Sequence, residues 1–305
     1  MLRMLALHLP ATLVIAGFVP VAAQESAASK DPSPQSVSFV RVDQDVRLEV
    51  LDWGGSGRPV VLLAGLNFTA HCFDDFAPNL TPFYHVVGIT RRGFGASTNA
   101  PSGYEANRLG DDVLTVLDSL NLKRPVLVGH SIAGEELSSV ATRDPEQVAG
   151  LIYLDAAFDF AFDNGKGVAL AEITKGADVL PPPPSPSSED LASYAAFGDW
   201  WARTTGFRLP EGELRQMRPP DANGRPGAER SYANVSRLIH GGKSKFTEIN
   251  VPVLALYAMP LTGLPDYFHS ASADDRAARE AFFVRSNELK EKQLKAFEEG
   301  FLMPA

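Results

Sequence analysis

The chain has 305 residues, of which 45% are hydrophobic and 21% are charged, a balance typical of a globular protein that can bury a sizeable core. Its formal net charge of −9 argues against a nucleic-acid-binding surface, because phosphate contacts need clustered lysine and arginine. The length allows one large domain, or one domain with a substantial insertion.

The first residues have the pattern of a signal peptide. A positive charge at Arg3 precedes an apolar stretch from Met4 to Val21, and Ala22 and Ala23 are small residues of the kind that a signal peptidase reads. We therefore expect residues 1–23 to be removed and the protein to be exported, to the periplasm or as a secreted protein. No stable membrane span is expected, because the apolar stretch is short for one and contains two prolines.

Several segments after this leader predict strands. Residues 24–35 are small and polar and predict a flexible leader. Residues 36–42 and 46–53 then predict two strands joined by a short polar turn. Continuous apolar runs of the kind that strands buried on both faces show follow at Pro59–Leu63, Tyr84–Ile89, Pro125–Val128, Leu151–Leu154 and, much later, Val251–Tyr257.

Helical patterns lie between the middle strands. Val113, Val116, Leu117 and Leu120 fall on one face of a helix, and residues 132–142 show a similar pattern. Buried strands that alternate with helices indicate βαβ units around a mostly parallel sheet, which is an α/β fold.

The segment between the last two strands is too long for a single crossover. It contains a run of prolines and several aromatic clusters, and we interpret residues 158–245 as a cap inserted over the carboxyl edge of the sheet. The predicted core then comprises residues 36–157 and 246–305.

Ser131 lies between the predicted strand at 125–128 and the helix at 132–142. In a parallel sheet, ligands bind beyond the carboxyl ends of the strands. A nucleophile at such an end needs a sharp turn, with small residues two positions before it and two positions after it. Gly129 and Ala133 supply them, so the sequence predicts Ser131 as a nucleophile.

The stretch Val37–Asp155 resembles the α/β-hydrolase fold, in its cap-bearing serine esterase and peptidase-like branch. The matching segments are the oxyanion segment at Leu62–Leu66, the Arg-Gly-x-Gly-x-Ser loop at Thr90–Ser97, the nucleophile elbow at Val128–Gly134 and the sixth strand at Leu151–Asp155. The resemblance implies hydrolysis of an ester or amide in a small-molecule substrate through an acyl-serine intermediate. No cofactor is expected, and no histidine and cysteine spacing suggests a metal.

The resemblance also implies which residues surround the nucleophile. The backbone N–H groups of Leu66 and Ile132 would form the oxyanion hole. Two acids could orient the base: Asp155, which ends the sixth strand, and Asp266, the first carboxylate after the seventh. We favour Asp155, because it would otherwise be an unpaired charge at the end of an apolar strand.

The base is the difficult part of this prediction. In the α/β-hydrolase fold it is a histidine after an eighth strand, but residues 272–300 predict a helix and only five residues follow Gly300. We therefore expect the last strand and the catalytic histidine to be absent from this chain, with His269 as the substitute base.

Two hypotheses follow from this expectation. The chain is either a serine hydrolase impaired by loss of that histidine, or a catalytically silent α/β-hydrolase-like protein that uses its capped pocket for binding. The substrate and the oligomeric state are left open.

Overall fold

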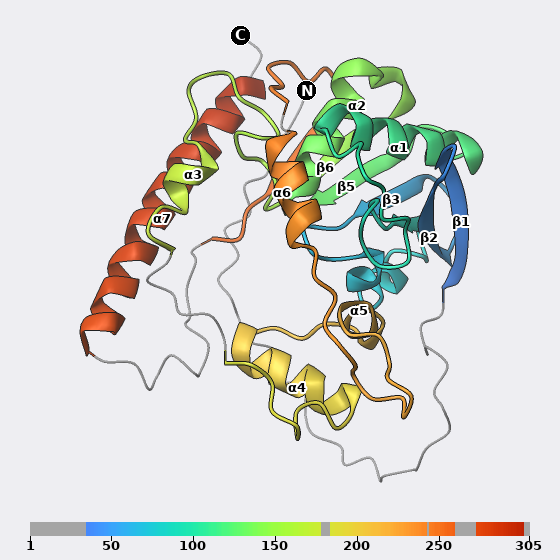
Figure 1. The fold of residues 1–305 in the computed structure, drawn as a ribbon. Coiled ribbons are helices and arrows are strands. Elements are labelled where there is room, and N and C mark those ends of the chain that lie inside the picture. The colour runs from blue at the N-terminus through green and yellow to red at the C-terminus, as the bar shows by residue number, and fades with distance from the viewer. Residues whose placement is uncertain (1–34, 178–183, 243, 260–272, 302–305) are drawn as a thin grey trace.

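A seven-stranded mixed sheet forms the centre of the molecule. The computed structural model describes residues 35–177, 184–242, 244–259 and 273–301. Figure 1 shows the sheet, and its strands stand in the order β1-β2-β4-β3-β5-β6-β7. Their bounds are β1 Ser36–Asp43, β2 Val46–Gly54, β3 Pro59–Leu63, β4 His85–Ile89, β5 Val126–His130, β6 Gly150–Leu154 and β7 Val253–Leu256.

Parallel pairing brings several strand ends to one edge of the sheet. β1 and β2 pair antiparallel, as do β2 and β4, whereas β4, β3, β5, β6 and β7 run parallel to one another. Leu63 pairs with Gly129, and His130 pairs with Leu154. The residues that follow β3, β5 and β6 therefore meet at the same edge, which is where sheets of this kind bind ligands.

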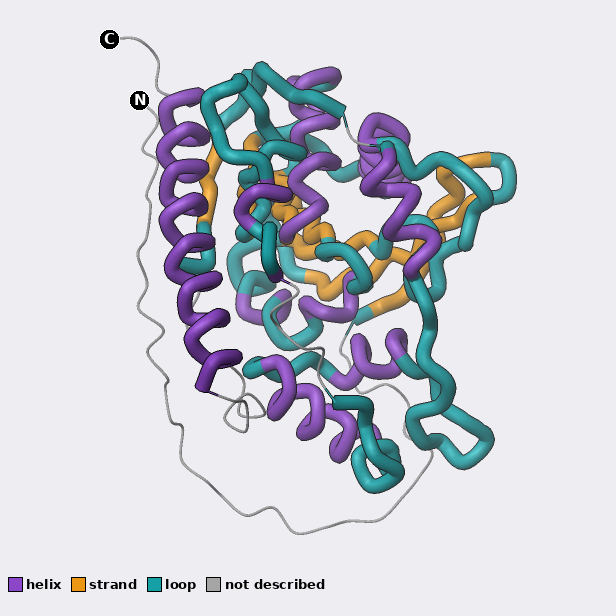
Figure 2. The backbone as a smooth tube through the Cα atoms, turned by 60° about the vertical axis from the view of Figure 1, so that its left-hand side comes forward, coloured by secondary structure: helices purple, strands orange, loops and turns teal. Residues whose placement is uncertain are grey.

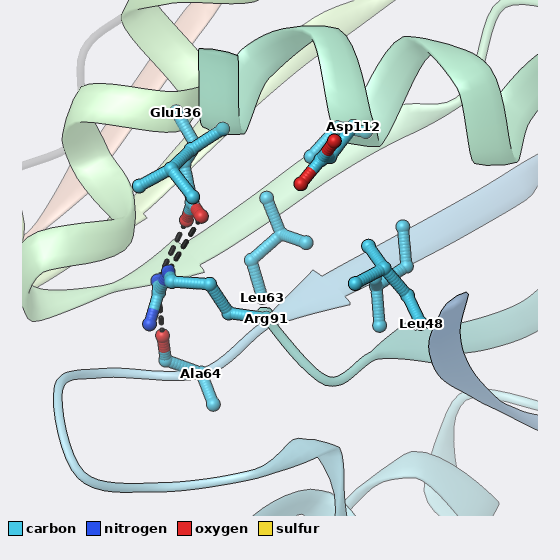
Figure 3. Close-up of a pocket in the computed structure, with 9 residues that line it drawn as sticks. Leu48, Leu63, Ala64, Arg91, Asp112 and Glu136 are labelled. Atoms are coloured by element: carbon cyan, nitrogen blue, oxygen red, sulfur yellow. Dashed lines mark hydrogen bonds and ion pairs between the residues drawn. The ribbon is translucent and has the colours of Figure 1, made fainter. Parts of the chain in front are cut away.

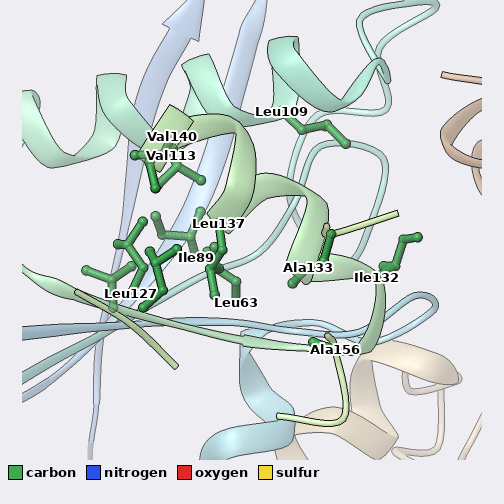
Figure 4. Packing of buried hydrophobic residues seen from close by; sticks show 14 of the residues in the cluster. Leu63, Ile89, Leu109, Val113, Leu127, Ile132, Ala133, Leu137, Val140 and Ala156 are labelled. Atoms are coloured by element: carbon green, nitrogen blue, oxygen red, sulfur yellow. The ribbon is translucent and has the colours of Figure 1, made fainter. Parts of the chain in front are cut away.

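Two helices, α1 (Ala106–Ser119) and α2 (Gly134–Arg143), pack side by side against one face of the sheet (Figure 1). Figure 4 shows the main hydrophobic core between these helices and the strands. It includes Leu109 and Val113 of α1, Leu137 and Val140 of α2, and Leu63, Ile89 and Leu127 of the sheet, all of them buried. Because both faces of the central strands are covered, these strands are the continuous apolar runs of the sequence.

The opposite face carries a smaller core. Leu51, Trp53 and Leu62 pack there against Ala70 and Phe73 of the short 3-10 helix η1 (Ala70–Phe73). Three further 3-10 helices are described: η2 (Ala77–Asn79), η3 (Ser131–Ala133) and η4 (Pro145–Gln147).

The chain between β6 and β7 contains four described helices. They are α3 (Leu170–Ile173), α4 (Tyr194–Thr205), α5 (Glu211–Met217) and α6 (Ala233–Gly241). α4 and α5 lie away from the layer formed by α1 and α2, and they enclose a small core of their own made of Tyr194, Phe197 and Leu214 (Figure 1).

The last described element is the long helix α7 (Ala273–Phe301), which stands beside α3 and runs along one side of the molecule (Figures 1 and 2). Its buried positions include Ser286, Lys290, Gln293 and Phe297. Ser286 Oγ donates to the carbonyl of Ile173, and Gln293 Nε2 donates to the carbonyl of Ala157. α7 is therefore attached to the body by polar as well as apolar contacts.

The structure confirms the predicted α/β fold and adjusts the element bounds. β5 extends two residues beyond the predicted strand at 125–128, and β7 is shorter than the predicted run at 251–257. The predicted helix at 272–300 is α7. Among the described strands, β7 is the outermost at its edge.

The predicted signal peptide at 1–23 and nearly all of the leader at 24–35 lie outside the described residues. Within the described ranges, no helix combines the length and the apolar character needed to cross a bilayer.

Candidate active site

Ser131 is held in a strained turn at the carboxyl end of β5. Its φ is 51°, in the left-handed region that non-glycine residues seldom adopt. The turn packs closely: a Cβ added to Gly129 would lie 2.6 Å from Leu137 Cδ1 and 3.1 Å from the carbonyl oxygen of Ala133. A small residue is therefore required at position 129, as the elbow pattern predicts.

Asp155 occupies the corresponding position on the neighbouring strand. His130 and Leu154 are partners in the β5–β6 ladder, so Ser131 and Asp155 each follow one member of that pair. Asp155 also has a positive φ, 45°, and its backbone N–H donates to the carbonyl of Leu256 at 2.7 Å. The structure thus brings the predicted nucleophile and the favoured acid to adjacent strand ends.

A lysine, not a histidine, contacts this acid among the described residues. Lys290 Nζ of α7 lies 2.6 Å from Asp155 Oδ1 and 3.0 Å from the carbonyl oxygen of Ala258. The Lys290 side chain is only 3% exposed, and its ammonium lies 5.5 Å from the centre of the Phe158 ring. Sequence analysis did not find this residue. The one signal for it is that Lys290 falls at helical spacing with Ser286, Gln293 and Phe297.

The segment predicted to supply the oxyanion hole lies against Ser131, the predicted nucleophile. A Cβ on Gly65 would be 3.4 Å from Ser131 Cβ, and Phe68 N–H closes a turn by donating to the Gly65 carbonyl at 3.3 Å. Leu66 lies inside this turn, and Ile132 follows Ser131 directly. No described residue accepts a hydrogen bond from the backbone N–H of Leu66 or Ile132.

A buried ion pair fixes the first end of this turn (Figure 3). Arg91 Nε and Nη2 donate to the two carboxylate oxygens of Glu136 at 2.6 and 2.7 Å. Arg91 Nη2 also donates to the carbonyl of Ala64 at 2.9 Å. Glu136 lies in the first turn of α2, five residues after Ser131, so this pair ties the start of the oxyanion segment to the elbow helix.

A second buried carboxylate fixes the other end. Glu213 of α5 accepts hydrogen bonds from the Thr69 N–H at 3.1 Å, through each of its oxygens, and from the Thr69 hydroxyl at 2.5 Å. Burial raises the pKa of Glu213 to about 7, against the opposing effect of the Thr69 hydrogen bonds and of His71. α5, the helix that carries Glu213, therefore contacts the chain three residues after the oxyanion segment.

The described histidines do not replace the expected base. Burial lowers the pKa of His130, against the opposing charge of Asp155. The His130 ring packs against Gly65, since a Cβ added to that glycine would lie 2.7 Å from His130 Nδ1. Burial opposes a charge on His71, but Asp74 and Glu49 outweigh it and raise the pKa of His71 to about 10, so this ring is a cation near neutral pH. Within the described ranges, no histidine hydrogen-bonds to Ser131.

Two of the predicted site residues cannot be placed. Asp266 and His269 both lie in 260–272, outside the described residues. Among the residues that are described, no group of three or more histidine, cysteine, aspartate or glutamate side chains is arranged to hold a metal ion.

Comparison with known families identifies the fold. The model of the "Alpha/beta hydrolase family" matches residues 60–296, which include the oxyanion segment, the elbow, Asp155 and most of α7. The chain belongs to this family.

Relatives of this alpha/beta hydrolase include enzymes that act on different bonds. It is 27% identical over 101 residues to 2-(acetamidomethylene)succinate hydrolase of Mesorhizobium japonicum, a match that covers 33% of this chain and 36% of that protein. It is 31% identical over 144 residues to epoxide hydrolase 4 of Mus musculus, covering 44% and 38% respectively. The chain thus matches little more than a third of each relative's length.

A solved structure shows the same fold over a longer stretch. The crystal structure of E-2-(acetamidomethylene)succinate hydrolase superposes with a TM-score of 0.56 at 19% sequence identity, and the match covers 81% of this chain and 87% of that one. The comparisons therefore show that this protein is an alpha/beta hydrolase whose homologues are hydrolases. The reaction of this member depends on its own residues, because the fold does not fix the chemistry.

Proposed function

We propose that this alpha/beta hydrolase is a serine hydrolase that cleaves an ester or amide bond in a small molecule through an acyl-serine intermediate. The observation that carries the proposal is the conformation of Ser131: a strained residue at the carboxyl edge of the sheet, packed against the Gly65 turn. Strain of this kind persists where the surrounding structure enforces it, and it is concentrated at functional sites.

In the proposed reaction, Ser131 Oγ attacks the carbonyl carbon of the substrate and its proton passes to a base. The N–H groups of Leu66 and Ile132 stabilise the oxyanion, each by about 3 kcal/mol. The bond to the leaving group then breaks, and the alcohol or amine takes up the proton. Water attacks the acyl-serine, which releases the acid and restores the Ser131 hydroxyl.

The base in this proposal is His269, because none of the described histidines hydrogen-bonds to Ser131. Asp155 remains the favoured acid for orienting it. The Asp155–Lys290 ion pair bears on this role, since a carboxylate that holds an ammonium at 2.6 Å is less available to an imidazole. We therefore expect slow turnover, about 100-fold or more below that of a relative with a fully formed base.

Substitution of Ser131 tests the nucleophile. We expect Ser131→Ala to abolish hydrolysis of p-nitrophenyl acetate and covalent labelling by an alkyl fluorophosphonate, because both need the serine oxygen. The control is Ser119→Ala, which changes an exposed serine on α1 and should leave both signals intact. Equal turnover and labelling in the Ser131→Ala protein would overturn the proposal.

A catalytically silent binding protein is the second candidate, and the Asp155–Lys290 pair favours it, because that pair engages the acid that would orient a base. The fluorophosphonate separates the two functions. Labelling at Ser131 that is lost in His269→Ala supports the hydrolase, whereas an unlabelled wild-type protein that still binds small ligands supports the silent form.

A further inference from the structure

A cavity of about 540 Å³ lies between the oxyanion segment and the helices of residues 158–245. This volume lies in the range of small-molecule sites. Trp201, Met217 and Tyr232 contribute aromatic and apolar surface to its wall, and Asn67 and Ser236 contribute polar groups. The cavity therefore suits a molecule with an apolar body and a few polar atoms.

The turn after Gly65 links the cavity to the proposed nucleophile. Asn67, which lines it, is two residues from Gly65, the residue that packs against Ser131. Asn67 has a φ of 68°, and its side-chain oxygen accepts a hydrogen bond from Ser236 Oγ at 2.8 Å. A molecule in the cavity could therefore present a carbonyl group to the turn that contains Leu66.

The wall of the cavity carries one cation that lacks an anionic partner. Glu229 and Arg230 both line it, but Glu229 is already paired with Arg218, whose Nη2 lies 2.8 Å from Glu229 Oε2. Arg230 Nη1 donates to the neutral side-chain amide of Gln216 at 3.1 Å. Among the described residues, no carboxylate lies within ion-pair distance of Arg230.

Trp201 contributes ring surface to this wall, because its donor is covered by protein atoms. The indole N–H of Trp201 is buried and makes no hydrogen bond to any described residue. The guanidinium of Arg230, which has no carboxylate partner among the described residues, matches the two oxygens of a ligand carboxylate.

We propose that this cavity selects esters or amides that carry a free carboxylate, with Arg230 as the residue that binds it. Arg230 holds the carboxylate through charge-assisted hydrogen bonds, and Trp201 and Tyr232 pack against the apolar body that joins it to the scissile bond. The substrate class rests on the proposed hydrolase function, but the recognition of a carboxylate does not depend on catalysis.

Two matched esters test this specificity: p-nitrophenyl butyrate, which is neutral, and mono-p-nitrophenyl glutarate, which carries a carboxylate. We expect the wild-type protein to prefer the glutarate by about 10-fold or more in kcat/KM. Arg230→Met should remove the preference, and Arg230→Lys should restore part of it. The matched control is Arg237→Met on α6, an exposed arginine that does not line the cavity and should keep the wild-type ratio.

Binding to the Ser131→Ala protein keeps the inference separate from the proposed chemistry. Calorimetry should detect the glutarate ester bound more tightly than the butyrate, and Arg230→Met in the same background should weaken glutarate binding by about 10-fold. Equal binding of the two esters, or an unchanged ratio in Arg230→Met, would overturn carboxylate recognition. Inactive wild-type protein that still binds the glutarate through Arg230 would contradict the hydrolase and support the inference.

Discussion

Lys290 is the residue that most changes the expected picture of the site. It places a buried ammonium on Asp155 from a helix 135 positions later in the sequence. The Lys290 ammonium is removed from water, whereas the Asp155 side chain is 30% exposed, so the ammonium depends on this carboxylate for its compensating charge. The pair therefore makes α7 part of the structure around the nucleophile.

Removal of the Lys290 charge should destabilise the protein. Lys290→Met keeps most of the apolar stem but leaves Asp155 without its cation, and we expect the free energy of unfolding to fall by about 2 kcal/mol. Urea denaturation measures this loss. Lys292→Met, at an exposed position of the same helix, should change the free energy of unfolding by less than about 0.5 kcal/mol.

A double variant separates the ion pair from general packing. Asp155→Asn combined with Lys290→Met should lower the free energy of unfolding by less than the sum of the two single changes. The reason is that the second substitution removes a charge that the first has left without a partner. Additive losses would show that the ion pair does not contribute to stability.

The residues of the candidate site differ in how far the sequence could predict them. Ser131 is predictable because an elbow needs a strand, small neighbours and a helix in immediate succession, which a single sequence displays. Lys290 is not, because its partner depends on where a long helix docks on the sheet. The placement of Leu66 and Ile132 as donors stays a prediction, as do the roles of Asp266 and His269.

The turn from Ala64 to Thr69, which contains the end of the oxyanion segment, is held at both ends by buried charges. The Arg91–Glu136 pair fixes Ala64 to the elbow helix, and Glu213 of α5 fixes Thr69. The sequence indicates neither contact, since each side chain alone looks like an ordinary surface charge. Arg91 donates to the backbone carbonyl of Ala64, and Glu213 accepts from the backbone N–H of Thr69. Each of these backbone groups would otherwise be buried without a partner.

Glu213 should give the protein a distinctive dependence on pH. Its folded-state pKa of about 7 lies above the usual glutamate value, so the folded protein retains a proton that the unfolded chain loses from about pH 4.5 upward. This contribution to the free energy of unfolding is complete below about pH 4.5 and is lost as the pH rises to about 7.

Glu213→Gln should flatten that part of the stability profile. Denaturation curves between pH 4.5 and 7 measure the slope, and the matched control is Glu211→Gln on the same helix, where the carboxylate pairs with Arg215. His71 faces Glu213 and titrates in a higher range, and Asp74 is unchanged in both proteins, so the difference between the two profiles isolates Glu213. Parallel profiles for wild type and Glu213→Gln would contradict this expectation.

On the scale of the whole molecule, the main hydrophobic core and the core of α4 and α5 differ greatly in size. The main core joins the sheet to α1 and α2, whereas the core beneath α4 consists of three buried residues. The central strands were predictable because burial on both faces gives each of them an apolar run. The helices α4 and α5 were not, because so small a core imposes little periodicity on their sequence.

This difference should appear in hydrogen exchange. We expect the amides of α4 to exchange through a partial opening whose free energy is at least about 2 kcal/mol below that of the β5 amides, because α4 loses few buried contacts when it detaches. Mass spectrometry of exchanging peptides measures both segments in one experiment. Equal protection of α4 and β5 would show that the molecule opens as one unit.

Because the backbone at Ser131 and Asp155 is left-handed, selection for stability and selection for activity favour different residues at these two positions. Glycine adopts that conformation without steric cost, whereas a residue with a side chain gives up about 1 kcal/mol to hold it. A library of variants ranked by thermal resistance alone would thus favour glycine at positions 131 and 155. It would remove both side chains proposed to act in catalysis, so a search for more stable variants of this protein should keep these two positions unchanged.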